Sequence, residues 1–227
     1  MSGEREEHIS VNARPRTQER YQSIIDNHII PRLGQVQLSK LTPADVKSLH
    51  SALLECGMAA AGVELVHTVL SGALKHAFRL ELIWRNPAVA IKPPKRVRGE
   101  LPPTTVQDVL RILQRARVSG HYLYAAIHLL AFTGVRRGEA LGLMWSDIDL
   151  DAGRFMINKS LIRTQKAGII IQPTKTDLSR RRIDLDPDTI EVLRAHRVKQ
   201  VEHRLKLGEA YEDRGLVFPD ELGRALN

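Results

Sequence analysis

The sequence predicts a mainly α-helical protein with a small antiparallel β-sheet, an α+β fold built in two parts. Three observations lead to this prediction. The first half holds apolar residues at helical spacing, a proline-rich basic segment follows, and the second half mixes helical patterns with short β-branched runs bounded by turn residues. With 43% hydrophobic residues, the 227-residue chain has enough apolar side chains to build a core.

Composition narrows the class of partner. The chain has 34 Lys and Arg against 26 Asp and Glu, a net charge of +8, which favours nucleic acid, although a merely soluble basic protein would also show it. The single cysteine, Cys56, excludes an intrachain disulfide and a Cys-based zinc cluster, and we expect it to be buried. Because no apolar stretch is long enough to span a membrane and no secretory signal is present, the sequence predicts a cytoplasmic protein without a membrane partner.

After a polar tail (residues 1–16), residues 17–90 predict a helical bundle. The first stripe is expected to end at Pro31, and the next helix to begin with Thr42 as N-cap and Pro43 at its first position. The third helix lies within 62–83. The expected core-facing residues are Tyr21, Ile24, Ile25, His28, Ile29, Val46, Leu49, Leu53, Val66, Val69, Leu70, Ala73, Leu74, Ala77 and Phe78.

A basic linker is predicted at residues 91–103. Five prolines between 86 and 103 exclude a continuous helix, and the stretch KPPKRVR carries four cations and no anion. Lys92, Lys95, Arg96 and Arg98 are therefore candidate contacts to a phosphate backbone. A solvated tether between domains explains the same composition equally well.

Residues 104–227 alternate helices and strands. We expect a capped helix in 104–117, a buried helix in 121–134, a short helix from 138, and a hairpin over 147–158. A second hairpin should pair GIIIQPT with RRRIDLD, which flank residues 175–179. A basic amphipathic helix should start at N-cap Asp186, with Pro187 at its first position.

The stretch TGVRRGEALGL (133–143) carries the first chemical signal. Arg136 follows a buried helix at the turn into another, a rigid position from which a planar guanidinium can grip two phosphate oxygens. The alternative is a surface arginine paired with Glu139. Lys175 lies at the mouth of the expected second hairpin, where it could reach a ligand or be an ordinary turn lysine. Arg180, Arg181 and Arg182 predict an exposed basic strand edge, with DNA contact or edge protection as the two explanations.

The order of these motifs resembles the tyrosine recombinases, also called phage-type integrases. The resemblance is carried by TGVRRGEALGLMWSDID, PTKTDLSRRRIDL and GLVFP, and it extends from about residue 17 to the end. IIDNHIIPRLGQVQLSKLTPADVKSLHSALLECG resembles the core-binding domain of that family. The resemblance implies a core-binding bundle at residues 17–90 followed by a catalytic domain from residue 104.

The resemblance also implies a reaction. Such enzymes hold double-stranded DNA at attachment-type sites, often with other protomers, and a tyrosine forms a 3′-phosphotyrosyl link without metal or cofactor. Arg136 matches the arginine that neutralises charge on the phosphorane, Glu139 an acidic residue that braces the site, and Lys175 the general acid that protonates the leaving 5′-oxygen. Arg137 matches a variable position.

Two parts of the family pattern are absent from the sequence: the His-x-x-Arg box and the nucleophilic tyrosine. HAFR (76–79) lies in the wrong domain, and Tyr211 has Glu209, Glu212 and Asp213 nearby, which disfavour a phosphate. We therefore expect an incomplete catalytic domain in a C-terminally truncated recombinase that binds DNA and is inactive alone. The alternatives are a non-catalytic DNA-binding regulator, or dominant-negative partner of an intact recombinase, and a chain that does not fold stably.

Overall fold

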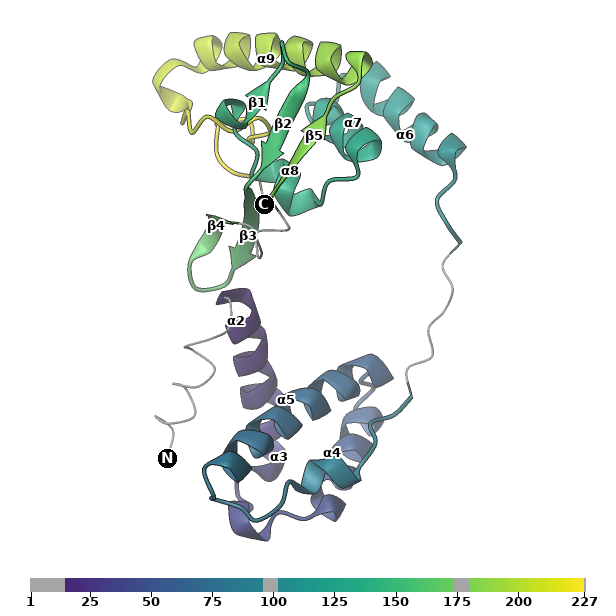
Figure 1. The fold of residues 1–227 in the computed structure, drawn as a ribbon, viewed down its shortest axis with the longest axis vertical. Helices are drawn as coiled ribbons and strands as arrows, with labels where there is room; N and C mark the ends of the chain where they lie inside the picture. Colours follow the sequence, from purple (N-terminus) through teal and green to yellow (C-terminus); the bar gives the residue numbers. More distant parts are fainter. Residues whose placement is uncertain (1–14, 96–101, 174–179, 227) are drawn as a thin grey trace. The chain divides into compact units, whose positions relative to one another are not determined.

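The computed structural model describes residues 15–95, 102–173 and 180–226. The chain forms two compact units, residues 1–101 and 102–227, each with its own hydrophobic core (Figure 1). Within the described ranges, no helix has the length and apolar character needed to cross a membrane. The mainly helical fold with small antiparallel sheets confirms the predicted fold class.

The first unit is a helical bundle. Its core is formed by Ile24, Val46, Leu49, Leu53, Val63, Val66, Val69, Leu70, Leu74, Ala77, Ile83 and Ala88. The elements are α2 (Pro15–Ile24), the π-helix η1 (Ile25–Ile29), α3 (Ile30–Leu33), the 3₁₀ turn η2 (Leu38–Lys40), α4 (Pro43–Glu55), α5 (Ala60–Arg79) and the 3₁₀ turn η3 (Pro87–Ala90).

Pro31 does not end the first helix, contrary to the prediction. The chain stays helical to Leu33, and the five residues before Ile30 form a π-helix. Proline lacks an N–H and its ring crowds the carbonyl four residues earlier, which an α-helix cannot accommodate without distortion. Here the preceding turn is widened, with the N–H of Ile30 donating to the carbonyl of Ile25, and the helix continues past the proline.

The capping prediction for α4 is confirmed, whereas three burial predictions are wrong. Thr42 accepts a hydrogen bond from the Asp45 N–H at 3.3 Å, and Asp45 accepts one from the Thr42 N–H at 2.8 Å. Ala73 and Phe78 are exposed, although their neighbours Leu74 and Ala77 in α5 are buried. Cys56 is also exposed, since it caps the end of α4.

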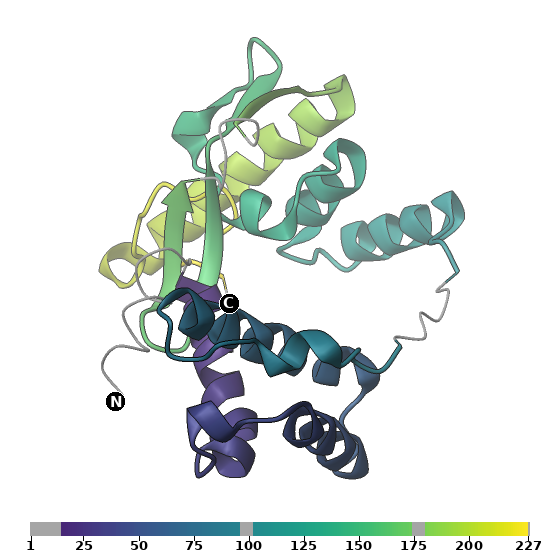
Figure 2. The same cartoon turned by 60° about the horizontal axis from the view of Figure 1, so that its bottom comes forward.

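The second unit contains two small antiparallel sheets and four α-helices in its described part (Figure 2). Strands β1, β2 and β5 form one sheet in that order, and β3 pairs with β4. The elements are α6 (Val106–Val118), α7 (Tyr124–Thr133), α8 (Arg137–Leu141), the 3₁₀ turn η4 (Trp145–Asp147), β1 (Ile148–Asp149), β2 (Arg154–Ile157), β3 (Lys159–Thr164), β4 (Gly168–Pro173), β5 (Arg181–Asp184), α9 (Pro187–Leu207) and the 3₁₀ turn η6 (Gly208–Ala210).

The second predicted hairpin is wrong. β4 pairs with β3, a strand that the sequence pattern did not predict, and β5 pairs with β2, with Ile183 opposite Phe155. The β3–β4 connection is a short turn that ends at Gly168, whose φ is 65°. A short turn costs little chain entropy to close, so the local pairing is favoured. The first hairpin, β1–β2, is as predicted.

Helix α9 begins at N-cap Asp186 as predicted, and the capped helix predicted within 104–117 is α6, with Thr105 as its N-cap. Helices α7 and α9 are less buried than predicted. In α7, Phe132 is 54% exposed, and Tyr122 in the preceding turn is 50% exposed. Helix α9 is not amphipathic in the expected sense, because it leaves Val198, Val201 and Leu205 mostly exposed. It buries Thr189 and Leu193 and packs against α7.

Candidate active site

The turn between α7 and α8 places Arg136. Gly134, at the C-cap of α7, has a φ of 62°, a left-handed conformation that glycine adopts without strain. Thr133 donates its hydroxyl to the Leu129 carbonyl at 2.6 Å, and Val135 is buried. Arg136 then takes an extended conformation as N-cap of α8, so that its backbone is fixed between two helices.

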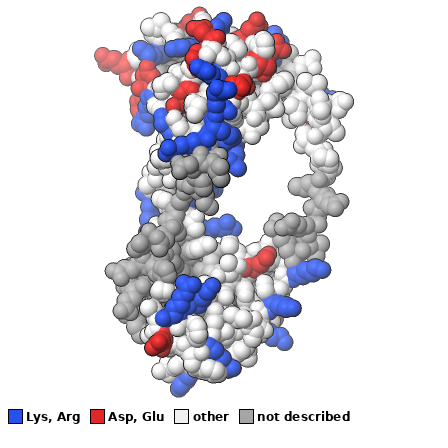
Figure 3. Space-filling view, in the orientation of Figure 1, with Lys and Arg blue, Asp and Glu red and all other residues white. Residues whose placement is uncertain are grey.

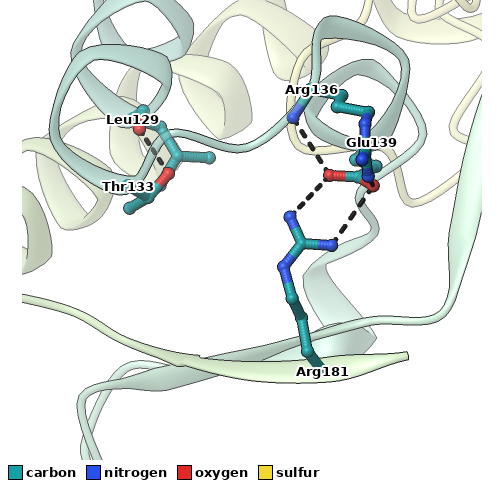
Figure 4. A network of polar contacts seen from close by, with 5 residues as sticks. All are labelled: Leu129, Thr133, Arg136, Glu139 and Arg181. Atoms are coloured by element: carbon teal, nitrogen blue, oxygen red, sulfur yellow. Dashed lines mark hydrogen bonds and ion pairs between the residues drawn. The ribbon is translucent and has the colours of Figure 1, made fainter. Parts of the chain in front are cut away.

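Glu139 is the centre of a polar cluster (Figure 4). Its Oε2 accepts the Arg136 backbone N–H at 3.0 Å, and its Oε1 accepts Arg136 Nη1 at 2.9 Å. Arg181 reaches the same carboxylate from β5, with Nη1 3.2 Å from Oε1 and Nη2 2.8 Å from Oε2. Two arginines from distant parts of the sequence therefore share one buried carboxylate.

The electrostatics of the cluster keep Glu139 ionised. Burial alone would raise its pKa, but hydrogen bonds from Arg181 and from the backbone and side chain of Arg136 lower the pKa to about 2. The hydrogen bond to Glu139 in turn raises the pKa of Arg181. With two guanidinium groups on one carboxylate, the cluster keeps one net positive charge.

The two arginines differ in exposure. The Arg136 side chain is 76% exposed, whereas that of Arg181 is 34% exposed and that of Glu139 only 4%. Arg136 directs Nη1 to Glu139 and presents the rest of its planar fork to solvent. This arrangement suits an oxyanion such as a phosphate, because a held guanidinium loses less freedom on binding than a free one.

β5 is an edge strand of its sheet, as predicted, but the predicted exposure is wrong for Arg181, which is half-buried. The pleat of β5 places Arg181 on the same face as Ile183, opposite Ile157 of β2, and this face turns toward the core. Arg180 and Arg182 are exposed as predicted. The sequence RRRIDL contains a signal for this orientation. Arg181 lies two residues before Ile183 and four before Leu185, and side chains at this spacing share one face of a strand. Because Ile183 and Leu185 are apolar, that face is expected to turn inward.

Two glycines let α8 pack closely against β3. A Cβ on Gly138 would lie 2.7 Å from both the Leu161 carbonyl oxygen and the Ser160 Oγ, and one on Gly142 would lie 2.8 Å from the Leu161 nitrogen. Both positions are therefore tight contacts between backbones. They fix the helix that carries Glu139 against the β3–β4 hairpin.

The other predicted site residues are distributed as follows. Lys175, Arg96 and Arg98 lie outside the described residues. Lys92 and Lys95 are exposed at the end of the first unit. On the face of the second unit drawn in Figure 3, Lys and Arg side chains form a band over the strands, while Asp and Glu gather mainly toward the end where α9 lies. Among the described residues, no group of His, Cys, Asp and Glu could hold a metal ion.

The sequence of the second unit matches a known family over most of its length. The profile of the phage integrase family matches residues 103–222, and that of the phage integrase N-terminal SAM-like domain matches residues 6–54. The chain belongs to the phage integrase family. The resemblance to tyrosine recombinases that the motifs predicted is thereby confirmed.

Curated relatives in this family are similar along nearly the whole chain. A protein described as tyrosine recombinase XerC-like from Caldanaerobacter subterraneus subsp. tengcongensis is 25% identical over 238 residues, covering 96% of this chain and 60% of the relative. An integrase from Streptomyces ambofaciens is 28% identical over 218 residues, covering 93% of the chain and 55% of the relative. The chain thus spans little more than half the length of these two integrase-family relatives.

Solved integrase structures share the fold. The Tn1549 transposon integrase in complex with transposon right end DNA superposes with a TM-score of 0.74 at 19% identity, covering 97% of this chain and 70% of that one. A lambda integrase dimer bound to a COC′ core site gives a TM-score of 0.65 at 22% identity, covering 98% of this chain and 57% of that one.

Proposed function

We propose that this chain binds double-stranded DNA and holds a backbone phosphate for site-specific recombination of the tyrosine-recombinase type. The observation that carries the proposal is the cluster in which a buried carboxylate holds Arg136 while most of its side chain stays exposed. Family membership and the DNA complexes of the Tn1549 and lambda integrases support it. In this proposal residues 17–90 form the core-binding domain, 91–103 the linker and 104–227 the catalytic part.

Each residue of the site has a distinct task. Arg136 neutralises the charge that develops on the phosphorane, and Glu139 fixes the orientation of that guanidinium. Lys175 protonates the leaving 5′-oxygen as general acid. The backbone on either side of the phosphate is contacted by Lys92, Lys95, Arg96, Arg98 and Arg180, with Arg181 held on Glu139. None of these tasks requires a metal or a cofactor.

We further propose that protomers assemble on DNA at attachment-type sites. The lambda integrase relatives have been solved as a dimer on a core site and as a tetramer on a Holliday junction. Strand exchange needs two cleaved strands to be held close together, which one protomer cannot do by itself.

Each tyrosine of the chain has a structural contact that accounts for its presence without a catalytic role. Tyr21 packs on the core of the first unit, Tyr122 stacks on His121, and Tyr124 lies edge-on to His128. Tyr211 accepts a hydrogen bond from Gln200 at 3.2 Å. We therefore propose that residues 1–227 alone bind DNA without cleaving it. The same surroundings favour the second candidate, a DNA-binding regulator that occupies recombination sites or pairs with an intact recombinase.

Binding to a fluorescently labelled mixed-sequence duplex at several salt concentrations tests the proposal. Each phosphate contact contributes about one unit to the slope of log affinity against log salt. We expect Arg136→Ala to reduce that slope by about one, whereas the adjacent exposed Arg137→Ala should leave it unchanged. Equal effects of the two variants would contradict the assignment of Arg136.

A nicked suicide duplex tests the cleavage step. We expect the chain to form no covalent adduct with it on a denaturing gel. A trapped adduct would show that a tyrosine of this chain attacks DNA, and it would overturn the proposal that these residues only bind. Inhibition of an intact relative by this chain in trans would favour the regulator.

A further inference from the structure

In the described part of the first unit, residues 15–95, the net charge comes from the last segment of the sequence. Residues 15–74 carry five Lys and Arg and five Asp and Glu, so their formal charges cancel. Residues 75–95 carry five cations against one anion, Glu81. The cations are Lys75, Arg79, Arg85, Lys92 and Lys95. A polyanionic partner of this unit is therefore attracted to the segment that runs from the last turns of α5 to Lys95.

Trp84 lies in the middle of this segment and is 75% exposed. The guanidinium carbon of Arg85 lies 4.3 Å from the centroid of the Trp84 ring, a cation–π arrangement. A tryptophan left this open to water gains a large apolar contact when a partner covers it. The adjacent pair thus combines a flat apolar surface with a positive charge.

Buried residues on both sides of Trp84 and Arg85 anchor the turn that carries them. Ile83 is 8% exposed and Ala88 is fully buried. Between them, Asn86 accepts the Ala88 N–H at 2.9 Å and donates its amide to the Ser71 carbonyl at 3.1 Å, which ties the turn to α5. Trp84 and Arg85 therefore project from an anchored turn, and little chain entropy is lost when they bind.

We propose that Trp84 and Arg85 form a DNA contact in which the indole packs against a deoxyribose of the duplex backbone and the guanidinium lies at a neighbouring phosphate. This inference rests on the proposed DNA-binding function and adds to it a contact that depends on apolar packing rather than on charge. Sugar and phosphate contacts carry no sequence information, so such a contact tolerates any sequence.

A protein partner is the competing occupant. Phe78, Leu80, Leu82 and Val89 are also exposed in this segment, by 49, 55, 58 and 76%. Apolar surface of this kind is common in protein interfaces. DNA is favoured because the net charge of residues 15–95, five cations against one anion, lies in the same segment.

Tryptophan fluorescence of the full chain provides the direct test. The chain has two tryptophans, and Trp145 in the other unit donates to Gln200 at 2.7 Å. The difference between the wild type and Trp84→Phe therefore isolates the Trp84 signal. We expect a mixed-sequence duplex to quench this signal and to shield it from acrylamide. Inorganic polyphosphate, a polyanion without sugars or bases, should bind the cations and leave the signal nearly unchanged.

Affinity measurements separate apolar packing from charge. We expect Trp84→Ala to weaken duplex binding about tenfold with an unchanged salt slope, and Trp84→Phe to retain most of the affinity. Arg85→Ala should lower the salt slope by about one. The control is Val118→Ala in the other unit, an exposed apolar residue that should not matter. Because Trp84 is mostly exposed, its variants should keep the wild-type Tm.

Two different results would contradict the inference, and the experiments distinguish them. If Trp84→Ala binds duplex as tightly as the wild type, and the indole stays open to acrylamide in the saturated complex, the inference is overturned and the patch belongs to a protein interface. If the wild-type chain does not bind duplex at low salt, the proposed function itself fails and this inference fails with it.

Discussion

Arg181 and Glu139, 42 residues apart in the sequence, are joined by two hydrogen bonds of 2.8 and 3.2 Å. This pairing links β5 to α8 and leaves Arg136 as the more exposed member of the cluster. Arg181 makes two hydrogen bonds to the Glu139 carboxylate, and Arg136 makes one through its side chain. Most of the Arg136 side chain therefore stays exposed to solvent. The site is thus organised around Glu139 rather than around Arg136 alone.

Replacing Arg181 should change the acidity of Glu139. We expect Arg181→Met to raise the pKa of Glu139 from about 2 toward its ordinary value of 4.5, because the largest favourable hydrogen bond to the carboxylate is lost. The titration can be followed by NMR of side-chain ¹³C-labelled glutamate. Arg182→Met is the matched control, since Arg182 pairs with Asp184 at 3.3 Å instead. Equal titration curves in the two variants would contradict a direct role of Arg181.

Neutralising Glu139 should destabilise the second unit. Glu139→Gln leaves two arginines beside a neutral amide that cannot satisfy both, and we expect a loss of about 1–3 kcal/mol in the free energy of unfolding. Urea denaturation followed by circular dichroism measures it. Glu191→Gln, on the exposed surface of α9, should have no effect beyond about 0.5 kcal/mol.

The same carboxylate predicts a pH dependence. The folded pKa of Glu139 is about 2 against an ordinary 4.5, so the folded state binds its proton more weakly than the unfolded state does. The stabilisation is therefore fully present above about pH 4.5 and is lost as the pH falls toward 2. We expect the difference in unfolding free energy between wild type and Glu139→Gln to shrink between pH 6 and pH 3. A constant difference would show that the pKa of Glu139 is the same in the folded and unfolded states.

Much of the fold could be predicted from local signals, and the failures have specific causes. The caps at Thr42 and Asp186 predicted two helix starts, because capping depends only on residues three positions apart. The pairing of β5 with β2 depends on a core contact between Ile183 and Phe155, which local sequence does not contain.

The candidate site was predicted in part. Arg136 and Glu139 follow from one short motif, since they lie three residues apart on one turn. Arg181 was named as a DNA contact because three consecutive arginines suggest an exposed edge, yet the inward apolar residues that follow it decide its orientation. The π-helix before Pro31 could not be predicted, because it depends on packing that favours continuation of the helix over its end.

A histidine pair, with His50 buried and His67 half-buried, predicts that the first unit is sensitive to acid. His67 Nδ1 and His50 Nε2 lie 3.3 Å apart between α5 and α4. Burial lowers the pKa of both rings, and for His50 the neighbouring His67 lowers it further. Because the folded pKa values lie below 6.5, stability is present above that pH and is lost as the pH falls. We expect the Tm of this unit to drop by a few degrees between pH 7.5 and 5.5, and His67→Asn to reduce that drop. An unchanged drop in the variant would assign the acid sensitivity to other groups.

A pair of glycine substitutions tests the close packing of α8 against β3. Gly138→Ala puts a Cβ 2.7 Å from a backbone oxygen, which neither strand nor helix can move away from easily, so we expect a loss of roughly 2 kcal/mol in the second unit. Gly72→Ala, inside α5 of the first unit, meets nothing within 4 Å and should stabilise that unit by about 0.5–1 kcal/mol. Differential scanning calorimetry of the full chain can follow both, since we expect the two units to unfold in separate transitions. Opposite shifts of the two transitions are the expected result. A Gly138→Ala protein as stable as the wild type would mean that α8 does not lie this close to β3, and that the position of Glu139 is set by its arginine partners alone.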